Sequence, residues 1–159
     1  MTIRKLQYGD REQIRQFIIE TEVFTYAEIS VAMELIDTFL NTPKQADYDC
    51  YSAVEGDEVL GYICLGPTPV TNGTFDLYWI VVKPSEHGSG VGTNLMKYAE
   101  DVVKQNQGRL LIAETSSQPK YEKTREFYLR VGYTELARIK DYYKVGDDLV
   151  VYGKYFMSN

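Results

Sequence analysis

The stretch Leu77-Tyr78-Trp79-Ile80-Val81-Val82-Lys83-Pro84-Ser85-Glu86-His87-Gly88-Ser89-Gly90-Val91-Gly92 decides the fold. Its first six residues are apolar on both faces, which predicts a central strand of a sheet. The strand ends at Pro84, because proline cannot donate to the sheet ladder. The glycines lead directly into an amphipathic helix, predicted over 91–107. The first N–H groups of a helix are unpaired and carry its positive dipole end, so this junction predicts an anion site.

Two better-known nucleotide loops are excluded by their spacing. A P-loop requires Gly-Lys-Ser/Thr, and Thr93 follows Gly92 with no lysine before it. A Rossmann fingerprint requires Gly-x-Gly-x-x-Gly in the first strand-helix unit of a parallel sheet. Here the spacing is Gly-x-Gly-x-Gly at 88–92, after several predicted antiparallel strands. The remaining alternative to an anion site is an ordinary strand-turn-helix junction.

Hydrophobic periodicity on either side of this stretch predicts the other elements. We expect strands at 2–7, 48–55, 59–65, 74–82, 109–115, 133–140 and 149–156. We expect further helices at 11–20, 27–40 and 121–131, with Asp10 capping the first. The last two strands should flank an aromatic turn over 141–148. The order predicts a mixed α/β sheet with helices on its faces.

Composition bounds the function. The chain has 159 residues, enough for one domain, and a formal net charge of −6 without a Lys/Arg cluster, which argues against nucleic acid as a partner. No apolar run is long enough for a membrane span, and the N-terminus lacks a secretory h-region, so a cytoplasmic protein is expected. Cys50 and Cys64 are expected to be reduced, buried thiols. With a single histidine, no metal site is expected.

From 77 to 98 the sequence resembles motif A of the GNAT superfamily of N-acetyltransferases, although His87 replaces the usual Gln or Arg. The resemblance implies one GNAT domain over 1–159, with a mixed, mostly antiparallel seven-stranded sheet and helices on both faces. It implies acetyl-CoA as donor, its pyrophosphate on the backbone amides of 88–93 and its pantetheine arm paired with the strand at 80–82. The implied donor-binding residues are Ile80, Val81, Val82, His87, Gly88, Ser89, Gly90, Val91, Gly92 and Thr93.

The helix around Tyr128 resembles motif B of the same superfamily, Phe-Tyr-x-x-x-Gly-Tyr in this chain. The resemblance implies that Tyr128 donates a proton to the leaving thiolate; the alternative is a core tyrosine. The second half also resembles ribosomal-protein alanine acetyltransferases, which implies Glu114 as general base, directly or through water. A strand-end carboxylate facing solvent is the alternative. Tyr121 replaces an Asn that contacts CoA in those enzymes. The simplest oxyanion donor is the backbone N–H of Val82.

The acceptor is expected to be a primary amine, on a small molecule or a peptide N-terminus. Tyr142 and Tyr143 resemble the aromatic turn of GNAT enzymes with such substrates and could form one wall, with Glu22, Phe24 and Tyr26 as the other. The expected reaction is direct transfer through a ternary complex. The alternatives are a non-catalytic acyl-CoA sensor, a binding module without CoA, and transfer of a longer acyl chain. A homodimer is left open.

Overall fold

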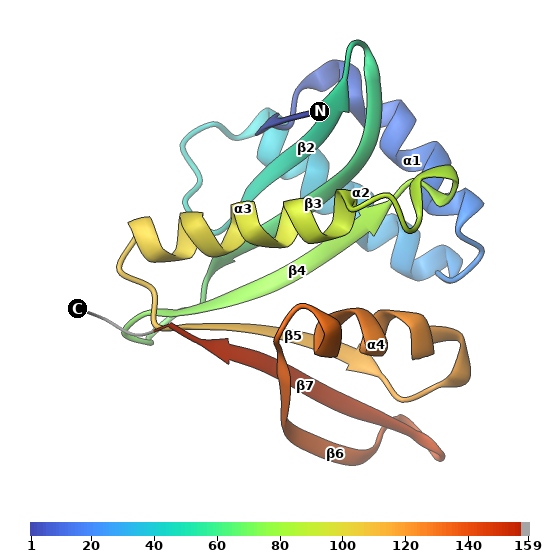
Figure 1. Cartoon of the computed structure of the whole chain (residues 1–159), viewed down its shortest axis with the longest axis vertical. Coiled ribbons are helices and arrows are strands. Elements are labelled where there is room, and N and C mark those ends of the chain that lie inside the picture. Colours follow the sequence, from blue (N-terminus) through green and yellow to red (C-terminus); the bar gives the residue numbers. More distant parts are fainter. Residues whose placement is uncertain (157–159) are drawn as a thin grey trace. The chain divides into compact units, whose positions relative to one another are not determined.

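The computed structural model describes residues 1–156 and contains seven strands and four α-helices in that range (Figure 1). The strands are β1 (Thr2–Lys5), β2 (Asp49–Glu55), β3 (Glu58–Pro67), β4 (Thr74–Val82), β5 (Leu110–Ser116), β6 (Thr134–Lys144) and β7 (Asp147–Tyr155). The helices are α1 (Arg11–Glu20), α2 (Tyr26–Asn41), α3 (Val91–Gln105) and α4 (Glu122–Arg130). Short 3-10 turns, Tyr8–Asp10, Pro84–Glu86 and Pro119–Tyr121, are η1, η2 and η3. The expected order of elements is confirmed.

The strand order in the sheet is β1-β2-β3-β4-β5-β7-β6. β4 and β5 run parallel, with residues 74–77 beside 110–113. β1 with β2, β2 with β3, β5 with β7 and β6 with β7 all run antiparallel. This is the mixed, mostly antiparallel seven-stranded sheet that the sequence predicts, with the apolar strand β4 at its centre.

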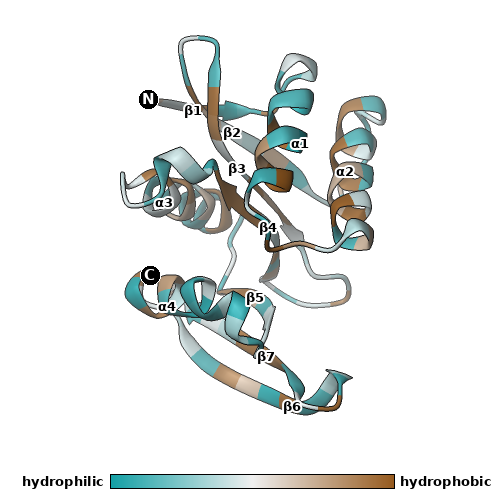
Figure 2. Cartoon of the chain, turned by 90° about the vertical axis from the view of Figure 1, so that its right-hand side faces the viewer, coloured by the Kyte–Doolittle hydropathy of each residue, from teal (hydrophilic) through white to brown (hydrophobic). Residues whose placement is uncertain are grey.

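The chain forms two compact units that share β4 and α3. The first comprises Met1–Gly66 and Tyr78–Ala99. In it α1 and α2 cover one face of the strands and α3 lies on the other (Figure 2). Ile14, Phe17 and Ile18 of α1 are buried at helical spacing and join a core cluster with Ala32, Met33 and Ile36 of α2.

Helix α3 packs unusually close to β3 within the first unit. A Cβ on Gly61 would lie 3.0 Å from the Val81 carbonyl oxygen, 3.1 Å from Leu95 and 3.2 Å from Val91. A glycine at 61 therefore lets the first turn of α3 sit directly against the sheet. This contact fixes where the N-terminus of α3 lies relative to the end of β4.

The second unit comprises Pro67–Leu77 and the chain from Glu100 onward. Its core gathers around α4, β5 and β7, with buried Leu111, Ala113, Tyr128, Tyr133, Leu149, Val150 and Tyr152. Glu100, 8% exposed, accepts a hydrogen bond from the Tyr133 hydroxyl at 2.8 Å and pairs with Lys154 at 3.2 Å. β6 is exposed along its whole length and occupies the edge of the sheet.

Two local expectations need correction. Asp10 is the N-cap residue of α1, as expected, but its side chain makes no capping hydrogen bond. The buried carboxylate instead accepts from the Arg4 guanidinium at 2.7 and 3.0 Å and from the Ser52 hydroxyl at 3.0 Å, partners that a buried charge requires. The expected aromatic turn over 141–148 is wrong, because β6 continues to Lys144 and β7 resumes at Asp147.

Candidate active site

The glycine loop joins β4 to α3 in the first unit. After Val82, the Lys83 N–H donates to the Leu60 carbonyl at 2.8 Å, which ties the exit of β4 to β3. The turn η2 follows, and the His87 N–H donates back to the Pro84 carbonyl at 3.2 Å. The helix begins at Val91. The strand, loop and helix predicted from the sequence are therefore in place.

Two of the loop's three glycines have a conformation that other residues rarely adopt. Gly88 has φ +83° and Gly90 has φ +91°, while Gly92 lies within the first turn of α3. A Cβ built on either positive-φ glycine meets no atom within 4 Å. The requirement for glycine is therefore conformational, and the space beside both residues is open to a ligand.

His87 closes the loop onto the strand. Its Nε2 lies 3.0 Å from the Val82 carbonyl oxygen, and Ser89 Oγ donates to the Glu86 carbonyl at 2.6 Å. With its proton on Nε2, the imidazole donates to that carbonyl and holds the last peptide of β4. This contact holds the His87 side chain against the strand, and its role in binding the donor stays a prediction.

The start of α3 is the candidate anion site. Its hydrogen-bond ladder opens with the Asn94 N–H donating to the Gly90 carbonyl at 3.0 Å. The N–H groups of Val91, Gly92 and Thr93 precede that bond and, as in any α-helix, lack intrahelical partners. Together with the helix dipole and the open glycines, they fit a pyrophosphate, as the sequence predicts for acetyl-CoA.

Tyr128 lies in the second unit, in the middle of α4. It is 5% exposed, and its ring packs 5.6 Å from that of Tyr152 and 6.2 Å from that of Tyr133. Within residues 1–156 its hydroxyl has no hydrogen-bond partner. Burial raises the pKa of Tyr128 above its ordinary value. The hydroxyl therefore keeps its proton at neutral pH and is free to donate it.

Glu114 lies on β5, opposite Val151 of β7, and is exposed. Its neighbours Ala113 and Thr115 are buried, so the strand alternates and turns this carboxylate outward. An exposed carboxylate can accept a proton directly or through water. Its position is compatible with both interpretations made from the sequence, a general base and a strand-end carboxylate that faces solvent.

A buried polar network at the end of β5 was not predicted. Asp147, 4% exposed, accepts hydrogen bonds from the Ser116 hydroxyl and from Gln118 Nε2, the latter at 2.7 Å. Arg125 of α4 donates to the carbonyls of Ser116 and Gln118, both at 2.8 Å. The segment that links β5 to α4 is thereby fixed to both α4 and β7. Nothing in local sequence spacing signals these contacts.

Tyr142 and Tyr143 lie on an irregular part of β6. The register with β7 shifts within residues 139–144, and Asp141 has φ +54°, an uncommon value for a non-glycine residue. The two rings are nearly perpendicular with centroids 5.0 Å apart, and the residues are 55% and 49% exposed. The irregularity therefore presents an aromatic pair at the surface.

Carboxylates hold this irregular segment. The Asp141 N–H donates to Asp148 Oδ1 at 3.0 Å, and the Gly146 N–H donates to Asp141 Oδ1 at 2.8 Å. Arg138 pairs with Asp148 at 3.1 Å. The Asp141 N–H bond and then Arg138 lower the pKa of Asp148 below its ordinary value. Asp148 is thus the anchor of the segment that carries the two tyrosines.

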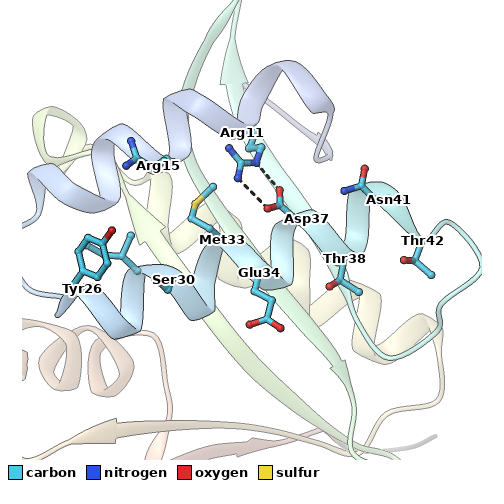
Figure 3. Close-up of a pocket in the computed structure, with 11 residues that line it drawn as sticks. Arg11, Arg15, Tyr26, Ser30, Met33, Glu34, Asp37, Thr38, Asn41 and Thr42 are labelled. Carbon is cyan, nitrogen blue, oxygen red and sulfur yellow. Dashed lines mark hydrogen bonds and ion pairs between the residues drawn. The ribbon is translucent and has the colours of Figure 1, made fainter.

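The residues expected to form the opposite wall have different surroundings. Glu22 is exposed with φ +58°. Phe24 packs edge-on against Trp79, with centroids 5.2 Å apart. Tyr26, 87% exposed, lines a pocket of about 510 Å³ between α1 and α2 (Figure 3). The Arg11–Asp37 ion pair spans that pocket, which is a groove between two helices and contains none of the other predicted site residues.

Residues 12–133 match the model of the acetyltransferase (GNAT) family. The chain belongs to the GNAT family of acetyltransferases. A protein from Desulfovibrio desulfuricans that is itself assigned to this family is 40% identical, with a TM-score of 0.92 over 97% of this chain and 98% of that one. The expectation of an acetyl-CoA-dependent N-acetyltransferase is confirmed at this level.

More distant GNAT structures share the fold. An aminoglycoside 6′-N-acetyltransferase complexed with coenzyme A is 19% identical, with a TM-score of 0.77 over 100% of this chain and 99% of its own. A ribosomal-protein-alanine N-acetyltransferase from Brucella melitensis is 16% identical, with a TM-score of 0.74 over 98% and 100%. No curated protein sequence matches this GNAT chain.

Across residues 1–156, no group of three or more His, Cys, Asp or Glu side chains converges as metal ligands would. In the same part of the chain, no helix has both the length and the apolar character that a membrane span requires.

Proposed function

We propose that this GNAT enzyme transfers an acetyl group from acetyl-CoA directly to a primary amine, on a small molecule or a peptide N-terminus, through a ternary complex. The observation that carries the proposal is the glycine loop, with two positive-φ glycines opening onto the unpaired N–H groups of α3. The donor's pyrophosphate would be held by the backbone of 88–93, and its pantetheine arm by the edge of β4 at 80–82.

The chemistry requires a neutral amine, a stabilised oxyanion and a proton for the departing thiolate. We assign these tasks to Glu114, to the backbone N–H of Val82 and to Tyr128. The amine nitrogen attacks the thioester carbonyl carbon, forming the C–N bond while Glu114 accepts the amine proton. The C–S bond then breaks, and the Tyr128 hydroxyl protonates the CoA sulfur. His87 supports the oxyanion donor by holding the adjoining Val82 carbonyl.

The acceptor would lie against Tyr142 and Tyr143, with Glu22, Phe24 and Tyr26 as further candidate contacts. The net charge of −6 suits an amine that arrives as a cation. Two fold relatives are named for aminoglycoside and ribosomal-protein-alanine acetylation, so both substrate classes belong in the screen.

The test is a turnover screen with acetyl-CoA against amino acids, polyamines, aminoglycosides and short peptides with free N-termini. Release of free thiol that depends on one acceptor class, with acetyl-amine product seen by mass spectrometry, supports the proposal. Isothermal titration with acetyl-CoA runs in parallel. Tight donor binding without turnover of any acceptor would favour the acyl-CoA sensor. A preference for longer acyl-CoA donors would favour transfer of a longer chain.

We further propose that residues 1–159 are one GNAT domain, since the family match spans residues of both units. We propose the cytoplasm as its location, where acetyl-CoA is available. A homodimer stays a prediction that sedimentation equilibrium tests.

A further inference from the structure

Two cysteines face each other across neighbouring strands of the first unit. Cys50 of β2 and Cys64 of β3 are directly opposed in the antiparallel register. Their Sγ atoms are 3.0 Å apart, closer than two unbonded sulfur atoms normally rest. Both thiols are free, and the residues are 0% and 1% exposed, within the core cluster that α1 and α2 cover.

The backbone around this pair has the geometry that a disulfide requires. The Leu6 N–H of the chain after β1 donates to the Cys50 carbonyl at 3.0 Å. In a strand, the N–H and C=O of one residue point to the same neighbour, so Cys50 bonds toward β1 and forms a non-hydrogen-bonded pair with Cys64. Such pairs have Cα atoms about 4.5 Å apart, inside the range of about 4.4–6.8 Å that disulfides span.

We propose that Cys50 and Cys64 form an oxidisable dithiol, which a peroxide converts into a cross-strand disulfide that staples β2 to β3. One sulfur attacks the peroxide oxygen, the O–O bond breaks, and a sulfenic acid forms with release of water. The second sulfur then attacks the sulfenic sulfur, the S–S bond forms, and the hydroxyl leaves as water with the second thiol's proton. Two thiols lose two electrons and one peroxide gains them.

The surroundings make this reaction slow and specific. The hydrogen bond that Cys64 shares with Cys50 and burial raise the pKa of Cys64, so little thiolate is present at neutral pH. Burial also restricts access to small oxidants. The sulfur atoms need to approach by only about 1 Å to reach the bonded distance. Once one sulfur is oxidised, its nearest thiol is the partner at 3.0 Å, so closure is favoured over further oxidation or mixed disulfides.

The bond would close a short loop through the β2–β3 hairpin and restrict the unfolded chain. A loop of this length predicts a higher melting temperature in the oxidised form, by about 5–10 °C. The effect belongs to the fold of the first unit and does not depend on the acceptor or on catalysis.

The experiment treats the purified, reduced full-length protein with hydrogen peroxide under native conditions and follows it by intact-mass spectrometry. The expected result is a mass loss of about 2 Da and a fall in the number of titratable thiols from two to none. A digest under non-reducing conditions should contain one disulfide-linked peptide that includes both cysteines. The melting temperature should rise and return after reduction with dithiothreitol. Cys50→Ala and Cys64→Ala are matched controls that should show no loss of 2 Da and no rise.

The mass change is measured on the wild-type protein, so the test remains valid even if a cysteine substitution destabilises the fold. Two thiols that still titrate after prolonged peroxide treatment would overturn the proposal. Oxygen adducts of about 16 or 32 Da on the cysteines, or disulfide-linked dimers in place of the internal bond, would overturn it equally.

Discussion

The glycine loop before α3 and the irregular end of β6 both hold uncommon backbone conformations, but by opposite means. The loop uses glycine at 88 and 90, residues that adopt positive φ without the strain that other residues incur. Asp141 in β6 adopts positive φ as a non-glycine residue, and Asp148 holds its N–H in place. In the proposed function the loop would therefore bind through its backbone, whereas the second unit would act through side chains that other side chains position.

This difference predicts that substitutions in the two units affect different kinetic constants. Changes in the loop should alter the affinity for acetyl-CoA, because its N–H groups are the proposed contacts to the pyrophosphate. Changes of Tyr128, Glu114 or Asp148 should leave donor affinity nearly unchanged and alter turnover or acceptor binding.

Tyr128→Phe should have the largest effect. A general acid contributes about 10²–10⁴-fold, so we expect kcat to fall by about 10²–10³-fold. The dissociation constant of acetyl-CoA, measured by isothermal titration, should change by less than about twofold. Because the phenyl ring keeps the packing against Tyr152 and Tyr133, the melting temperature should hold.

Phe127→Leu is the matched control, a neighbouring aromatic on α4 without a hydroxyl. It should lower kcat far less than Tyr128→Phe. Equal turnover of wild type and Tyr128→Phe would remove the proton-donor role and leave Tyr128 as a core residue.

Glu114→Gln should have the next effect, about a 10–100-fold loss of kcat/KM for the acceptor near neutral pH. Raising the pH should recover part of the loss, because more of the amine is then already neutral. Steady-state rates at varied acceptor concentration and saturating acetyl-CoA, measured across a range of pH, give both the loss of kcat/KM and its recovery. A kcat/KM equal to that of wild type across the pH range would show that Glu114 is a solvent-facing carboxylate.

The glycine loop illustrates what the sequence can reveal about a site. Positive φ favours glycine, and the first N–H groups of any helix that follows a strand and a turn are unpaired. The local sequence of residues 82–93 is therefore enough to predict their conformation. The order of the elements along the chain and most of their bounds follow likewise from periodicity. Asp10 occupies the expected cap position, but its side chain binds Arg4 and Ser52 in place of the helix N–H groups. Ser52 lies 42 residues away, so local spacing does not reveal that contact.

The second unit was harder to predict for the same reason. Asp147 meets Ser116 and Gln118 only after β5 and β7 pair, and no spacing in the sequence encodes that meeting. The segment 141–148 was expected to be a turn, since its polar and aromatic residues are typical of turns. Its strand continues because Asp148 satisfies the backbone of Asp141 from the paired strand.

Gly90→Ala should weaken acetyl-CoA binding by about tenfold, since a non-glycine residue at left-handed φ costs roughly 1–2 kcal/mol. The measurement is the dissociation constant by titration, with kcat at saturating donor expected to stay within about twofold. Ser89→Ala, in the same exposed loop, removes only the hydroxyl bond to the Glu86 carbonyl and should bind almost as wild type. Donor affinity unchanged in Gly90→Ala would mean that the loop conformation is not used in binding.

Asp148→Ala should have the smallest effect, on the acceptor alone. It removes the acceptor of the Asp141 N–H bond, so the acceptor KM should rise about two- to tenfold with donor KM unchanged. Asp148→Asn keeps a side-chain oxygen for that N–H and loses only the exposed pair with Arg138, so it should stay close to wild type. The pKa of Asp148 is lowered in the folded protein, so its contribution is present at neutral pH and is lost only as pH falls through that lowered value. If Asp148→Ala instead weakens donor binding, or if Asp148→Asn is as impaired as Asp148→Ala, the hydrogen bond to Asp141 is not what positions Tyr142 and Tyr143.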